Sequence, residues 1–181
     1  MKHVFSTFPI LPNFLGENIK VEQYEYSIKT EHFGILAKNR NYYDSIRAIQ
    51  GGILYDGINT NSLQLPGYGN ETYNFIKSRI AAKGIHLFFD IGELNIAASR
   101  ESLSLDVATR KNILNKIDIV KNSLREYVIN KVAQTENVWE AGKVLDQIFG
   151  EIFSYDRNIM QIILKQDLTY NNEVIYNNKT S

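Results

Sequence analysis

A long amphipathic pattern that begins near Asp106 constrains the fold of this chain more than any other feature. Apolar residues recur there at spacings of three and four positions. This spacing places them on one face of an α-helix, and such a stripe is nearly always part of a hydrophobic core and only rarely a cofactor site. The stripe consists of Ile113, Leu114, Ile117, Val120, Leu124, Val128 and Val132.

The stretch before this helix predicts the central strand of a sheet. Residues 85–97 are apolar on both faces for much of their length, which suits an interior strand covered by helices. Alternating patterns predict three shorter strands at residues 21–30, 34–38 and 45–55. Within the last of these, Gly51-Gly52 is interpreted as a bulge or a close backbone approach. Residues 56–70 are rich in glycine and asparagine, so an exposed, adaptable loop is expected there.

Further helices are predicted from Asn70 or Thr72 to about Lys83, from Val138 to about Phe149, and from about Ile159 to Lys165. Residues 168–176 carry turn residues between two β-favouring pairs and predict a hairpin. The expected class is α+β, with a mixed sheet, helices on one face and a C-terminal helical segment. The expected regions are an extended arm at 1–20, a main domain at 21–133, a helical extension at 134–166, and at 167–181 the start of a further hairpin or a disordered tail.

Composition narrows the function. The chain has 181 residues, 20 basic and 20 acidic residues, and no cysteine. A zero net charge argues against a general nucleic-acid binder, and the lack of cysteine excludes disulfide scaffolds and cysteine-ligated metal sites. There is no signal-peptide pattern and no 18-residue apolar span. We therefore expect a soluble intracellular protein without a transmembrane segment, with peripheral membrane association left open.

The segment between the predicted strand and the long helix delivers one arginine, Arg100, in a short loop of small residues. A guanidinium ahead of a helix commonly binds phosphate, because its fork matches phosphate oxygens bidentately. The candidate binding residues are Ser99, Arg100, Ser102 and Ser104. The alternative, which spacing alone leaves equally open, is that Arg100 only pairs with a local carboxylate such as Glu101 or Asp106.

Other chemistry is weakly indicated. His3, His32 and His86 show no metal-ligand spacing, and no metal site is expected. Asp90 and Glu93 suit an acid–base pair, although a salt link to Arg100 or Arg110 is the preferred interpretation. The glycines at 67 and 69 lack the Gly-Lys-Ser/Thr of a phosphate loop. The only tryptophan, Trp139, is interpreted as a packing anchor for its helix.

The same residues carry a family resemblance. The segment from Leu94 to Leu103 resembles the Leu-Asn-Ile-Ser-Arg-Glu-x-Leu segment in the middle domain of HtpG-type chaperones, which belong to the gyrase–HtpG–MutL ATPase superfamily. A larger part of the chain, about residues 45–176, resembles the phage rapid-lysis A family, which protects against prophage-induced early lysis. The matching segments, in order, are Gln50–Tyr55, Ser99–Asp106, Val138–Ala141 and Leu168–Asn171.

This resemblance implies a fold like the second domain of ribosomal protein S5. It also implies that Arg100 reaches the γ-phosphate of an ATP, with its Mg²⁺, bound in a neighbouring domain, where such a group stabilises transition-state charge. Two departures bear on the reach of Arg100: Ala97-Ala98 lengthen the segment, and Ser104 replaces the chaperone glutamine.

The superfamily's own ATP-binding motifs are missing. The Glu-x-x-x-Asn helix is absent, and Asp56-Gly57 is followed by Ile58-Asn59 instead of completing Asp-x-Gly-x-Gly. The chain alone is therefore not expected to be an enzyme or to hold a cofactor. The resemblance implies the transducer domain of a phage ATPase in the host cytoplasm. Its implied partners are an upstream nucleotide-binding domain, a second copy, or a phage or host protein. The alternative is a stand-alone phage interaction module with no nucleotide role.

Overall fold

The computed structural model of the chain describes residues 24–37, 45–77, 84–99, 102–153 and 155–177. The arm expected at residues 1–20 lies outside these ranges, as do Arg100, Glu101 and the part of the predicted second helix at residues 78–83. Of the helices in these described ranges, none is both long and apolar enough to cross a membrane.

A five-stranded mixed sheet forms one layer of the fold. Its strands follow the order β1-β2-β5-β3-β4, and all neighbours are antiparallel except the parallel pair β3–β5. The strands are β1 (Tyr26–Lys29), β2 (Phe33–Leu36), β3 (Ser45–Gln50), β4 (Ile53–Asn59) and β5 (Ile85–Phe89). The predicted α+β class with a mixed sheet is therefore confirmed.

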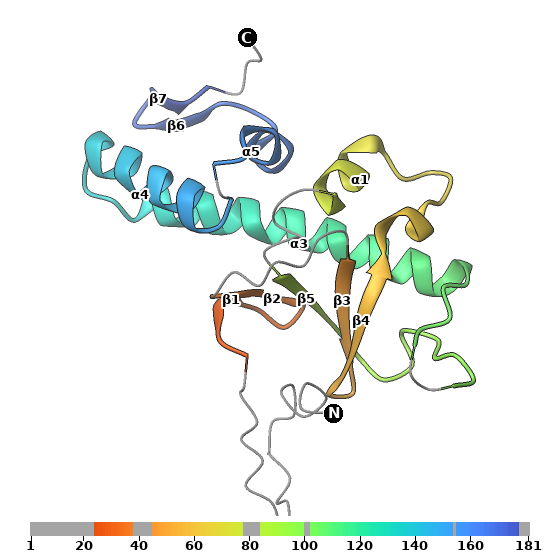
Figure 1. Cartoon of the computed structure of the whole chain (residues 1–181). Coiled ribbons are helices and arrows are strands. Elements are labelled where there is room, and N and C mark those ends of the chain that lie inside the picture. The colour runs from red at the N-terminus through yellow and green to blue at the C-terminus, as the bar shows by residue number, and fades with distance from the viewer. Residues whose placement is uncertain (1–23, 38–44, 78–83, 100–101, 154, 178–181) are drawn as a thin grey trace, which may run out of the picture.

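The helices of the described residues lie on one side of this sheet, and α3 runs across it (Figure 1). They are a 3₁₀ turn, η2 (Thr60–Leu63), then α1 (Asn70–Ile76), α3 (Val107–Ala133), α4 (Val138–Glu151) and α5 (Arg157–Leu164). A two-stranded sheet, β6 (Leu168–Tyr170) and β7 (Glu173–Tyr176), follows α5 and packs against α4.

Helix α3 confirms the long amphipathic pattern. Asp106 caps its N-terminus by accepting a hydrogen bond from the backbone N–H of Thr109. Every residue of the predicted apolar stripe is buried, each exposing 3% or less of its surface. The stripe therefore forms the centre of the core between the sheet and the helices, and α3 is the element on which the other helices pack.

The predicted strand at residues 45–55 is wrong in one respect, because it is two strands. Gly51 and Gly52 have φ values of 59° and 81°, and Gln50 pairs with Ile53 across them. Two consecutive positive φ values define a type I′ hairpin turn, which two glycines adopt without steric cost. The glycine pair is thus a hairpin turn and not a bulge. Accordingly, the first part of the expected loop at 56–70 is strand β4 and the 3₁₀ turn.

The predicted central strand is also shorter than expected. It ends at Phe89, because a turn follows in which the backbone N–H of Glu93 donates to the carbonyl of Asp90 and Gly92 has a φ of 96°. Apolar residues beyond the turn belong to a separate small hairpin that leads into α3. The hairpin predicted at residues 168–176 is confirmed, with Asn171 and Asn172 at positive φ in its turn.

Trp139 does not anchor its helix. Its side chain is 69% exposed, whereas Ala141, Leu145 and Ile148 form the buried side of α4. The helical period places Trp139 away from those three positions, so the core excludes the largest side chain of α4.

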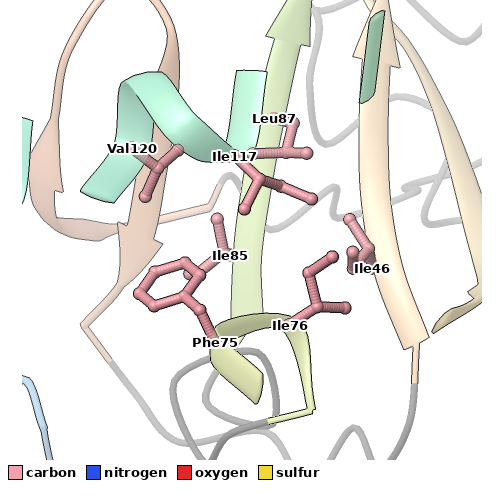
Figure 2. A pocket seen from close by; sticks show the side chains of 7 residues that line it. All are labelled: Ile46, Phe75, Ile76, Ile85, Leu87, Ile117 and Val120. Carbon is pink, nitrogen blue, oxygen red and sulfur yellow. The ribbon is translucent and has the colours of Figure 1, made fainter. Parts of the chain in front are cut away.

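A small cavity lies between the sheet, α1 and α3 (Figure 2). Its volume is about 20 Å³, close to the space of a single water molecule. Only apolar side chains line it, so it offers a water molecule no hydrogen-bond partner and is no ligand site. The lining residues are Ile46, Phe75, Ile76, Ile85, Leu87, Ile117 and Val120.

Candidate functional site

The predicted site lies on a short hairpin between β5 and α3. The backbone N–H of Ala97 donates to the carbonyl of Ser102 at 2.9 Å, and that of Ser104 donates to the carbonyl of Asn95 at 2.7 Å. Ile96 and Leu103 form an isolated antiparallel bridge between these two bonds. The segment is therefore paired at its base and opens into the connection that contains Arg100.

Two sets of contacts fix the base of this hairpin. On one side, Asn95 donates from its side chain to the Asp106 carboxylate at 2.6 Å and from its backbone to the Thr109 hydroxyl at 3.0 Å. On the other side, the buried Gln50 side chain bonds both backbone groups of Leu94, at 2.7 and 3.1 Å. The hairpin is thus tied to the start of α3 and to the end of β3.

The Asp106 carboxylate is committed to these structural contacts. The backbone N–H of Thr109, followed by the side chain of Asn95, holds the pKa of this carboxyl below its usual value. The backbone carbonyl of Asp106 also accepts from the Arg110 guanidinium at 3.4 Å. Asp106 therefore acts as the N-cap of α3 and holds the Asn95 side chain.

Of the predicted site residues, Ser99 lies beyond the paired base, whereas Ser102 and Ser104 take part in its backbone hydrogen bonds. Ser99 and Ser102 are exposed, and Ser104 is half-buried at the base. Arg100 and Glu101 connect Ser99 to Ser102 and lie outside the described residues. The structure brings the serines together on one loop and leaves the role of the arginine a prediction.

The neighbouring acidic pair is part of the scaffold. The side chain of Glu93 accepts from the backbone N–H of Asp90 at 2.7 Å and lies 3.6 Å from the Lys116 ammonium of α3. Arg110, the predicted partner, donates instead to the carbonyl of Gln64 at 3.1 Å. Glu93 therefore stabilises the turn after β5, and its ion-pair partner, Lys116, lies about 1.7 helical turns beyond Arg110 on α3.

Four aliphatic side chains on the β5–α3 connection and on the first residues of α3 and β4 are exposed. Ile91 is 86% exposed, Val107 62%, Ile96 44% and Ile53 41%. The Ile91 side chain lies beside Gly51, so the β3–β4 turn and the turn after β5 are neighbours.

The sheet carries a second polar group that sequence reasoning missed. Arg47 and His86 are register neighbours on β3 and β5, and both are buried. Side chains alternate along a strand, so they lie on the face opposite the cavity-lining Ile46 and Ile85. The Arg47 guanidinium pairs with the Asp56 carboxylate at 3.0 Å.

His86 is held in the same layer by two tyrosines. Its Nδ1 lies 2.8 Å from the Tyr26 hydroxyl, and the Tyr24 ring meets its ring edge-on at 4.6 Å. Burial, followed by the nearby Tyr24, raises the pKa of the Tyr26 hydroxyl far above its usual value. The signal in the sequence is a polar residue, Arg47 or His86, flanked by apolar residues within each of two strands, and the burial of both side chains shows that the second face is also covered.

The described residues contain no group of three or more histidine, cysteine, aspartate or glutamate side chains placed to hold a metal ion. A scan against protein-family models found no match for this chain, and searches of curated proteins and of solved structures found none either.

Proposed function

We propose that this chain is the transducer domain of a phage ATPase related to the rapid-lysis A family, with an S5-like fold. In this proposal Arg100 contacts the phosphates of an ATP·Mg²⁺ bound in a neighbouring domain. The loop around it transmits the nucleotide state to the sheet and α3, and so to a partner protein.

One observation carries this proposal: hydrogen bonds fix both sides of the hairpin base from which the connection containing Arg100 starts. The bridge between Ile96 and Leu103, the cap at Asp106 and the Gln50 contacts all hold the base. A guanidinium that stabilises a transition state must be held in position before negative charge develops on the phosphate. A hydrogen-bonded hairpin base can hold it in this way.

The hydrogen bonds of the hairpin base also connect the loop to helix α3. Asn95 bonds both Asp106 and Thr109 at the start of α3, and α3 spans the core. A displacement of the loop by a bound phosphate would act on the first turn of that helix. Coupling of this kind needs an element shared by the two sites, and α3 is such an element.

Arginine substitutions in the parent protein, which supplies the nucleotide-binding domain, test the proposal. Arg100→Ala is expected to lower kcat for ATP hydrolysis by about 10³-fold or more, because the transition-state charge loses its guanidinium. Arg100→Lys is expected to recover only a small part of the lost kcat, because an ammonium group cannot bind two phosphate oxygens in fork geometry. Arg125→Ala, on α3, is the matched control and should turn over ATP normally.

The alternative function is an interaction module without a nucleotide role. The exposed Ile91 and Ile53, on the neighbouring turns after β5 and between β3 and β4, favour it, because a docking surface needs exposed apolar side chains whether or not ATP is involved. Two results would favour the interaction module over the transducer domain. One is ATP turnover that Arg100→Ala leaves unchanged, and the other is a gene that encodes no adjoining nucleotide-binding domain.

A further inference from the structure

Helix α4 presents a second exposed face, remote in sequence from the Arg100 loop. Its buried side packs toward the core through Ala141, Leu145 and Ile148, and Phe149 contacts the hairpin at Tyr176. Figure 1 shows α4 alongside α3, with β6 and β7 beside it. The remaining side lines a shallow groove of about 550 Å³, formed by Val138, Trp139, Gly142, Lys143, Asp146 and Gln147.

These six positions form two adjacent columns along the helix, since they recur at alternating spacings of one and three. Trp139 stands at one end of the columns, exposed over two thirds of its surface. Gly142 lies at their middle, and nothing lies within 4 Å of the place where its Cβ would be. A second backbone can therefore approach α4 closely at Gly142, as small residues allow at helix crossings.

The charged side chains of this face lie on either side of Gly142. The Lys143 ammonium lies 3.5 Å from the centre of the Trp139 ring, so its charge sits toward the N-terminal end of the face. Asp146 carries the opposite charge toward the C-terminal end. The two charges of this face therefore cancel, but they are separated: the positive charge lies toward its N-terminal end and the negative charge toward its C-terminal end.

We propose that two copies of the chain associate through this face, with their α4 helices antiparallel and crossing beside Gly142. An antiparallel two-fold arrangement places Trp139 of one copy opposite the partner's Asp146. The Lys143 ammonium, which already lies over Trp139, then meets the partner's Asp146, and symmetry repeats the contact. The charge pattern is complementary to itself in this orientation, and a parallel orientation would place like charges together.

The expected dimer is weak. Helix α4 has 14 residues and is therefore about 21 Å long. One helix face of that length buries less than the roughly 1,200 Å² typical of stable complexes. Trp139 supplies the apolar anchor, because tryptophan dominates the energetics of many interfaces when it becomes buried. The inference is independent of the proposed nucleotide role.

Charge reversal tests the pairing directly. Lys143→Glu alone and Asp146→Lys alone each create two like-charge contacts, so each should weaken self-association by at least about tenfold. An equimolar mixture of the two variants should form a heterodimer, because both contacts in it are attractive. The double variant, with both charges exchanged, should again form a homodimer. Lys111→Glu and Glu126→Lys, exposed on α3, change the net charge equally and should have no effect.

The measurement combines sedimentation velocity with fluorescence of the only tryptophan over about three decades of concentration. Association should shift the Trp139 emission to shorter wavelength as the ring leaves water, in step with the sedimentation coefficient. A chain that stays monomeric throughout, whatever other protein binds α4, overturns the proposal. So does a dimer that neither charge reversal weakens, or a mixture of the two variants that stays monomeric.

Discussion

Asp106 joins the candidate loop to the long helix through one carboxylate. It accepts from the backbone N–H of Thr109 at 2.8 Å and from the side chain of Asn95 at 2.6 Å. Both bonds favour the ionised form, and they hold the pKa of this carboxyl below its usual value. The folded state therefore binds the Asp106 proton less tightly than the unfolded state does.

This sign predicts how stability depends on pH. The contribution of Asp106 is fully present above the unfolded pKa, about 3.9, and is lost as the pH falls through the lower folded pKa. Asp106→Asn should lower the thermal midpoint at neutral pH, and Asp106→Ala should lower it further because asparagine still caps a helix. The gap between the native chain and Asp106→Asn should narrow in acid.

Thermal unfolding followed by circular dichroism between about pH 2 and pH 7 measures this dependence. Asp90→Asn is the control, since it removes an exposed carboxylate beside the same loop. A gap between the native chain and Asp106→Asn that is the same at every pH would contradict the assigned role of the charge.

Residue-scale contacts were the least predictable part of the site. The sequence placed Glu93 within reach of Arg110, yet its partner is Lys116. Which turn of α3 faces the strand depends on how the helix docks, and spacing along one chain does not contain that information. The pair between the buried Arg47 and the exposed Asp56 is also unpredictable from the sequence pattern, because a single strand over residues 45–55 does not bring the two residues side by side.

At the scale of elements, long helices are predicted from the sequence more accurately than short strands. Helix α3 has 27 residues, and its periodicity is repeated often enough to fix both its type and its buried face. The sheet strands have four to seven residues, so a single turn can be mistaken for a bulge, as happened at Gly51-Gly52. The central strand was overextended because the small hairpin after it is also apolar.

The contact between α3 and the sheet leaves the cavity of about 20 Å³. Val120→Ile adds one methyl group beside it and should raise the free energy of unfolding by about 0.5–1 kcal/mol. Val128→Ile is the matched control, because Val128 is equally buried on the same helix but does not line the cavity. There the added methyl should destabilise by about 1–3 kcal/mol through overpacking.

Urea unfolding of the two variants gives both free energies. A Val120→Ile variant that is no more stable than the native chain, or a pair of variants with equal effects, would show that the core relaxes around the cavity.

At the scale of the whole molecule, the described residues share one core. The sequence predicts a main domain at 21–133 followed by a helical extension at 134–166. Buried residues of α4 and α5 nevertheless belong to the same cluster as those of the sheet and α3. The Tyr170 hydroxyl also bonds the carbonyl of Thr135, which ties the last hairpin to the end of α3.

Native-state hydrogen exchange tests this continuity. Amides at Leu145 and Ile148 in α4 should exchange with the same free energy as those at Leu124 and Val128 in α3, because opening either helix exposes the common core. Lower protection in α4, with its own dependence on denaturant, would instead identify the extension as an autonomous unit.

Strand β5 has a consequence for how the chain folds as it is synthesised. It lies between β2 and β3, about 50 and 40 residues away in sequence from the partners to which it bonds. The β1–β2 and β3–β4 hairpins are local and can form early, but each keeps an unpaired edge until β5 emerges. The ribosome delivers β5 first and the covering helix α3 after it. The interval in which the inner edges of β2 and β3 can pair with another nascent chain therefore ends once β5 has emerged, and the connection at residues 90–106 separates it from the covering helix.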